Sequence, residues 1–233
     1  VKNNVSFVEK HCGDNLKVLE LGSGNSKFLY ALDQKNLLNF GYGIEISNSR
    51  IRFANKWKKD LGNENVYNYE GNILNTNFDY LGDADLIYCV DLAFQFIDPL
   101  STGSDKELLR KVYNHLNPDG KIILELDTHK RLIDRMENNS LKTWQEFSDP
   151  DPWKYLLWDC SLEGQNTVIN KTFIKRDFSE TSENKVILKN YHRHDIISMM
   201  QRVGFKNCKV YEQWGKEPDL LEDEFIVVGE KYA

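Results

Sequence analysis

Short apolar runs of strand length alternate with helically spaced polar segments over roughly the first half of this chain. A strand, a helix and the next parallel strand follow one another in this rhythm in βαβ units. The expected strands are residues 17–21, 42–46, 66–69, 84–90 and 121–126, and the expected helices are 26–36, 48–60 and 105–116. The pattern predicts an α/β fold with a doubly wound, mostly parallel sheet and helices on both faces.

The pattern changes in the segment 148–192. Extended stretches there are separated by polar turns, which indicates an inserted region of antiparallel strands at about 155–160, 167–176 and 185–189. We therefore expect residues 1–147 to form the α/β core and 148–192 to lie on the substrate side.

Helical spacing returns at 195–203, and Gly204 is the expected C-terminal stop of that helix. Two strands, 209–213 and 225–229, close the chain. They complete a predicted sheet of seven strands, so that residues 193–233 finish the core.

Composition narrows the class of protein. The chain has 233 residues, of which 40% are hydrophobic, so it can bury one sizeable core. Its net charge of -6 lacks the basic excess that binding to a phosphate backbone usually requires, which makes nucleic acid an unlikely partner. No apolar run approaches the roughly 20 residues that span a bilayer, so no membrane association is expected.

The N-terminal segment and the cysteines favour a cytoplasmic location. Residues 1–16 are charged and lack the apolar stretch of a secretory signal. The four cysteines are scattered without a CxxC pair, which argues against a disulfide framework and against a zinc site: Cys12, Cys89, Cys160 and Cys208.

The most informative motif is VLELGSGNS at 18–26, an apolar strand that leads into a glycine turn and a helix. Gly22 and Gly24 let the backbone approach a ligand closely. The third glycine of the dinucleotide fingerprint would fall at Lys27, whose side chain obstructs close packing of helix on strand. The motif therefore favours a ligand without a pyrophosphate over NAD or a flavin dinucleotide.

Glu20-x-Gly22-x-Gly24 after a strand resembles the first motif of the class I S-adenosylmethionine-dependent methyltransferases. The likeness extends over about residues 15–126 and implies the Rossmann-like fold of that family, S-adenosylmethionine as cofactor and methyl transfer as activity. Glu45 ends the second strand, about twenty residues past the glycine turn, where a ribose-binding carboxylate is placed. In the family this carboxylate accepts hydrogen bonds from both ribose hydroxyls.

Further motifs follow in the order of the family. Residues 65–73 resemble the third motif, in which an acidic residue and its neighbour contact adenine; here Asn72 stands at the acidic position, with an ordinary turn asparagine as the alternative. Residues 85–91 resemble the fourth motif, and 116–121 the turn and strand after it. The residues expected to bind the cofactor are Glu20, Gly22, Ser23, Gly24, Glu45, Ile46, Asn72, Ile73 and Val90.

Three residues are candidates for catalysis. Asp91 ends the central strand, where a helix N-cap is the alternative role. His129 follows the fifth strand. His192 stands where, by resemblance, the chain returns from the inserted strands to the cofactor side, so an imidazole of pKa about 6.5 is a candidate general base, with a helix-flanking surface histidine as the alternative. No histidine pair has zinc-site spacing, so no metal is expected.

The position of the insertion resembles that in small-molecule methyltransferases, including those acting on sugar amines and glycine-like amines. We expect methyl transfer to a nitrogen or oxygen of a small-molecule acceptor. No Asn-Pro-Pro-Tyr type sequence stands at 90–93, which weakens the case for a macromolecular acceptor. The alternatives are a non-catalytic S-adenosylmethionine-binding or interaction module, a methyltransferase acting on protein or RNA, and an NAD-dependent oxidoreductase. The sequence leaves open whether the chain forms a homodimer.

Overall fold

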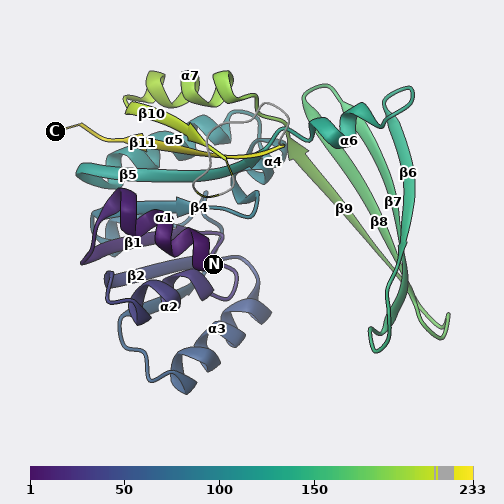
Figure 1. Cartoon of the computed structure of the whole chain (residues 1–233), viewed down its shortest axis with the longest axis horizontal. Coiled ribbons are helices and arrows are strands. Elements are labelled where there is room, and N and C mark those ends of the chain that lie inside the picture. Colours follow the sequence, from purple (N-terminus) through teal and green to yellow (C-terminus); the bar gives the residue numbers. More distant parts are fainter. Residues whose placement is uncertain (213, 215–222, 233) are drawn as a thin grey trace.

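The computed structural model describes residues 1–212, 214 and 223–232, and it contains two separate β-sheets (Figure 1). The larger sheet has seven strands in the order β10-β11-β5-β4-β1-β2-β3. Its strands are β1 (Leu16–Leu21), β2 (Leu38–Glu45), β3 (Val66–Glu70), β4 (Ala84–Cys89), β5 (Leu116–Asp127), β10 (Lys206–Tyr211) and β11 (Glu224–Glu230). Strands β1 to β5 are parallel, whereas β11 pairs antiparallel with both β5 and β10. The predicted doubly wound sheet of seven strands is confirmed.

Helices cover both faces of this sheet because its central strands are apolar on both sides. In β4, Leu86 and Tyr88 pack with the helices α1 (Lys2–Cys12) and α2 (Lys27–Gln34). The alternating residues Ile87 and Cys89 pack with α5 (Ser104–His115) and α7 (Arg193–Val203). Successive side chains of a strand point to opposite faces, so a continuously apolar strand needs a cover on each side.

Most predicted elements of the core occur close to their expected positions. Helix α3 (Asn48–Asp60) has the predicted bounds, and α7 ends before Gly204, whose φ is 127°. The turn expected within residues 116–121 lies inside β5, as an interruption in the pairing of β5 with β4. Helix α1 was not predicted, and Gln213, the expected end of the penultimate strand, lies outside the described residues.

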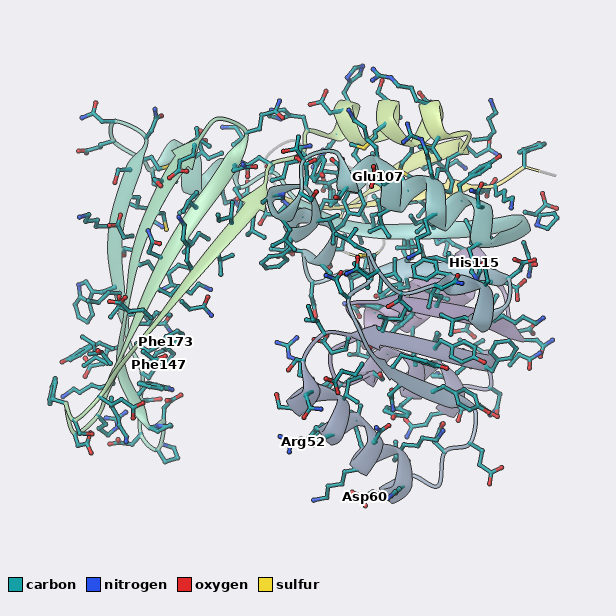
Figure 2. All side chains as sticks on the ribbon, turned by 180° about the vertical axis from the view of Figure 1, so that it is seen from behind. Arg52, Asp60, Glu107, His115, Phe147 and Phe173 are labelled. Carbon is teal, nitrogen blue, oxygen red and sulfur yellow. The ribbon has the colours of Figure 1, made fainter. Side chains whose placement is uncertain are left out.

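The second sheet has four antiparallel strands in the order β6-β7-β8-β9, and it projects from the core in Figure 1. Its strands are β6 (Ser140–Glu146), β7 (Trp153–Glu163), β8 (Asn166–Lys175) and β9 (Thr181–Lys189). The predicted start at 148 is wrong because it leaves out β6, which pairs with β7 along its whole length. Figure 2 shows Phe147 and Phe173 near the end of this sheet that lies away from the core.

The inner end of the second sheet packs on the core. Cys160, Ile169 and Leu188 form a small apolar cluster that also includes Leu92 and Leu132, the latter from helix α6 (Lys130–Asp134). The attachment is therefore at the carboxyl side of β4 and β5, where the 3-10 helix η2 (Ala93–Phe96) and helix α4 (Ile97–Leu100) follow β4.

Within the described ranges, no helix has the length and apolar content needed to cross a membrane. In the same part of the chain, no three or more histidine, cysteine, aspartate or glutamate side chains gather as a set that could hold a metal ion. All four cysteines are free thiols.

Candidate cofactor-binding site

All nine predicted cofactor-binding residues line a single cavity of about 720 Å³, together with Asp91. They come from the ends of β1, β2 and β4 and from the loop after β3. The carboxyl ends of parallel strands meet at one edge of an open sheet, and such an edge is where these folds bind ligands. The topology thus brings together residues that are separated in the sequence.

The glycine turn forms the floor of this cavity. Gly22 and Gly24 have positive φ angles of 72° and 57°, a conformation that glycine adopts without steric cost. The backbone amides of Gly22 and Ser23 donate to the carbonyl of Ile44, at 2.9 and 3.0 Å, which fixes the turn to β2. A Cβ on Gly22 would lie 2.8 Å from the Cβ of Ala93, so the turn also packs against η2.

Glu45 stands at the end of β2 and is only 5% exposed. Its Oε2 accepts a hydrogen bond from the Gly24 amide at 2.9 Å, and its Oε1 accepts one from the Ser47 amide at 2.8 Å. Each carboxylate oxygen has a second lone pair, so Glu45 can hold the glycine turn and still accept hydrogen bonds from a ligand in the cavity.

Glu20, at the other side of the turn, is also 5% exposed, and its Oε2 has no hydrogen-bond partner among the described residues. Burial raises the pKa of Glu20 well above 4.5, and the neighbouring carboxylates of Asp91 and Glu45 raise it further. Glu20 lines the cavity, and a cationic ligand group bound there would offset the cost of a buried, unpaired carboxylate.

The loop after β3 supplies an apolar part of the cavity. Ile73, in this loop, is buried, whereas Ile46, which follows β2 and also lines the cavity, is 69% exposed. The Oδ1 of Asn72 accepts a hydrogen bond from the Leu74 amide at 2.9 Å, so Asn72 forms a local turn. Asn72 Oδ1, the oxygen that would accept a hydrogen bond from adenine, therefore already accepts one from the backbone.

Asp91 lines the cavity and has a positive φ of 52°. It does not act as the N-cap of η2, since that position is Leu92. Its amide donates to Oε2 of Glu125 at 2.9 Å, and Oε1 of Glu125 accepts from the Trp214 indole at 2.7 Å. Burial raises the pKa of Glu125. Glu125 thus positions Asp91, a relation across two strands that no local motif signals.

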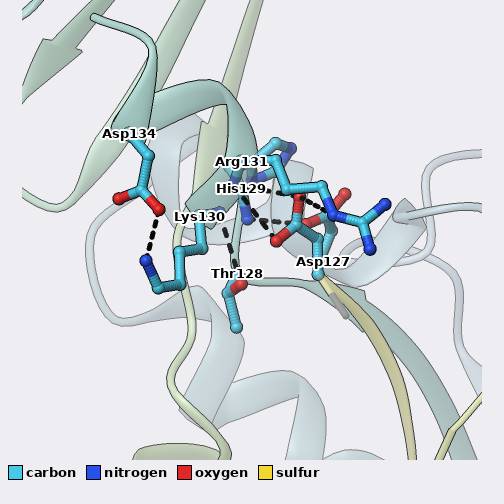
Figure 3. Close-up of polar contacts among 7 residues, drawn as sticks. Asp127, Thr128, His129, Lys130, Arg131 and Asp134 are labelled. Atoms are coloured by element: carbon cyan, nitrogen blue, oxygen red, sulfur yellow. Dashed lines mark hydrogen bonds and ion pairs between the residues drawn. The ribbon is translucent and has the colours of Figure 1, made fainter. Parts of the chain in front are cut away.

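The two candidate histidines do not lie in this cavity. His192 lines a second cavity of about 580 Å³, beside α7 and the turn between β7 and β8, and the two cavities share no lining residue. His129 is buried next to α6, and its amide donates to Oδ1 of Asp127 at 2.5 Å (Figure 3). The structure therefore does not bring either histidine together with Asp91, contrary to the expectation that the junction at His192 faces the cofactor.

Several cavity residues were not predicted from the sequence. Asn4 of α1 donates to the Tyr88 hydroxyl at 2.7 Å, and both residues line the cavity. On another side, Phe96, Ile97 and Leu100 form an apolar wall. Asn4, Ile97 and Leu100 stand outside the motifs of the sequence, because each reaches the cavity through tertiary packing.

A family model described as "Methyltransferase domain" matches residues 13–159, which is more than half of the chain. Among curated protein sequences, none matches. The fold is similar to that of an S-adenosylmethionine-dependent methyltransferase from Clostridium acetobutylicum, with 18% identity, a TM-score of 0.81, and coverage of 100% of this chain and 92% of that chain.

Two further solved structures share the fold. The CcbJ methyltransferase from Streptomyces caelestis has 14% identity and a TM-score of 0.82, with coverage of 100% of this chain and 89% of that one. An amino pentose methyltransferase from Micromonospora echinaspora has 13% identity and a TM-score of 0.70, with coverage of 97% and 88%. From the family match and the sheet order together, the chain belongs to the methyltransferase-domain family and is a class I S-adenosylmethionine-dependent methyltransferase.

Proposed function

We propose that this chain transfers the methyl group of S-adenosylmethionine to a nitrogen or oxygen atom of a small-molecule acceptor. The observation that carries the proposal is the single cavity lined by the glycine turn, Glu20 and Glu45. Structures of similar fold include a sugar N-methyltransferase from Streptoalloteichus and a glycopeptide N-methyltransferase. These similar structures support a small-molecule acceptor for this chain.

The cavity residues fit the chemical groups of the cofactor. The unpartnered carboxylate of Glu20 suits the ammonium of the methionine portion. Glu45 has free lone pairs for the two ribose hydroxyls, since each of its oxygens accepts only one backbone amide. Ile46 and Ile73 offer apolar surface to the adenine ring.

S-adenosylmethionine, when bound, supplies a methyl group already activated by the sulfonium. The chain's own residues then have to position the acceptor and exclude water. Phe96, Ile97 and Leu100 give the cavity an apolar wall that serves water exclusion. Asp91, held through its amide by Glu125, is the residue that we propose accepts a proton from a hydroxyl or ammonium acceptor.

A screen of small amines, amino sugars and alcohols tests the acceptor class. Each compound is incubated with protein and S-adenosylmethionine, and S-adenosylhomocysteine is quantified. We expect turnover with an amine or alcohol, and Asp91→Asn is expected to lower it by roughly a hundredfold, as for loss of a proton acceptor. Turnover found only with a protein or RNA acceptor would contradict the proposal.

The two glycines are expected to respond differently to alanine. A Cβ on Gly24 would contact only Arg50 Nη1, at 3.7 Å, whereas one on Gly22 would collide with Ala93. Gly24→Ala should therefore fold with a penalty of about 1 kcal/mol from its positive φ, yet bind S-adenosylhomocysteine poorly. Gly22→Ala should lower the free energy of unfolding more. Thermal melting and calorimetric titration of both variants check this; normal affinity in Gly24→Ala would exclude close backbone approach at that position.

We propose that His192 is not the general base that the sequence led us to expect. Since His192 lines the second cavity, we expect His192→Ala to keep cofactor affinity and turnover. A roughly hundredfold loss of turnover with unchanged cofactor affinity would instead restore it as a general base.

A further inference from the structure

Residues 93–100, here termed the wall segment, connect the cofactor cavity with the second sheet. The segment comprises η2 and α4. Its residues Ala93, Phe96, Ile97 and Leu100 line the cavity. The intervening residues Gln95 and Asp98 instead bond to the last residue of β9, Lys189. One short segment thus contributes to the cavity and is tied to the second sheet.

Lys189 makes ionic contacts with two carboxylates. Its Nζ lies 2.9 Å from Oδ2 of Asp98 and 2.8 Å from Oδ2 of Asp105, which is the second residue of α5. The side chains of Lys189 and Asp98 are each 15% exposed, and that of Asp105 is fully buried. The Tyr191 hydroxyl donates to the same Asp105 oxygen at 2.7 Å.

The backbone of Lys189 forms a second link. Gln95, which is fully buried, donates from Nε2 to the carbonyl of Lys189 at 2.7 Å and to that of Asp127 at 2.9 Å. Its Oε1 accepts from the Asp127 amide at 2.7 Å. The Gln95 amide group therefore joins η2, the end of β5 and the end of β9 at one point.

The Lys189 contacts are charged and directional. Burial alone would lower the pKa of Lys189, but the hydrogen bonds and charges of Asp105 and Asp98 outweigh it and raise that pKa. A buried ion pair of this kind is weak evidence for added stability, because well-packed apolar residues often serve as well. The hydrogen bonds of Lys189 fix one arrangement of Asp98 and Asp105, and Asp98 belongs to the wall segment of the cofactor cavity.

We propose that Lys189 is a positioning residue for methyl transfer. Lys189 holds the wall segment against the cofactor cavity and thereby makes ligand binding in that cavity depend on the second sheet. The inference rests on the proposed function, since it takes S-adenosylmethionine as the ligand of the cavity. Lys189 itself does not line that cavity, so it acts through Asp98, Asp105 and Gln95.

The test compares Lys189→Met with Lys185→Met, a control that removes an exposed lysine from the same strand. Affinity for S-adenosylhomocysteine is measured by calorimetry at a temperature where circular dichroism shows all proteins folded. We expect Lys189→Met to raise Kd about tenfold, a change equivalent to about 1.4 kcal/mol. Amides of residues 93–103 should exchange faster with solvent, while those of β1 and β4 keep their protection.

Two more variants keep the test decisive. Lys189→Arg retains the charge and the donors, and we expect it to restore most of the affinity. Asp98→Asn removes one carboxylate while Asp105 still pairs with Lys189, and it should raise Kd about threefold even if Lys189→Met fails to fold. Wild-type affinity in every folded variant, with unchanged exchange in residues 93–103, would overturn the inference. Absence of binding by the wild-type protein would instead overturn the proposed function.

Discussion

Replacing Glu45 with alanine is expected to weaken binding of S-adenosylhomocysteine by about 2 to 4 kcal/mol, roughly 30- to 1,000-fold. The variant loses the carboxylate oxygens proposed to accept from the ribose hydroxyls. It also frees the amides of Gly24 and Ser47, which Glu45 holds at 2.9 and 2.8 Å. The glycine turn would then lose one of its anchors as well as a ligand contact. Isothermal titration calorimetry measures the effect.

Glu70 provides a matched control. It ends β3 directly opposite Glu45 in the strand register, but it is exposed and accepts its hydrogen bond from Asn48. Glu70→Ala should bind S-adenosylhomocysteine like the wild type. If Glu45→Ala also did so, the assignment of the ribose to Glu45 would have to be given up.

Replacing Glu20 with glutamine should have opposite effects on stability and on binding. The pKa of Glu20 in the folded protein is raised well above 4.5 by burial and by the carboxylates of Asp91 and Glu45. A raised pKa contributes stability that is fully present below the unfolded-state value and is lost as the pH rises through the folded-state value. At higher pH the ionised Glu20 therefore destabilises the ligand-free protein, and a neutral glutamine of the same size removes that penalty.

Ligand binding should change in the other direction. Glutamine carries no charge that could pair with the ammonium of the methionine portion. We therefore expect Glu20→Gln to bind S-adenosylhomocysteine at least tenfold more weakly. Urea unfolding of the ligand-free proteins at several pH values should show that the stability advantage of the variant grows as the pH rises above about 4.5. A variant that is less stable at every pH, or that binds normally, would refute the proposed role of Glu20.

The cofactor site was predictable because its signals are local. The glycine turn and the carboxylate at the end of β2 are each visible in a few consecutive residues. Parallel strand order then places their carboxyl ends at one edge, so the cavity contains all nine residues expected from the sequence. Their individual roles stay proposals that the variants above test.

The missed features depend on long-range packing. All residues of β6 are exposed or half-buried, and its sequence shows no apolar alternation from which a strand could be predicted. The location of His192 depends on how the second sheet joins the core, which places it beside α7 instead of the cofactor cavity. The contacts of Lys189 with Asp98 and Asp105 join residues far apart in the chain, and no spacing rule connects them.

We expect the cavity above the glycine turn to bind S-adenosylmethionine. Calorimetric titration of the wild-type protein with S-adenosylmethionine, S-adenosylhomocysteine and NAD tests it most directly. We predict saturable binding of one molecule of S-adenosylmethionine or S-adenosylhomocysteine per chain, weaker binding in Glu45→Ala, and no binding of NAD. Saturable binding of NAD with no response to S-adenosylmethionine or S-adenosylhomocysteine would show that this cavity is not a site for S-adenosylmethionine.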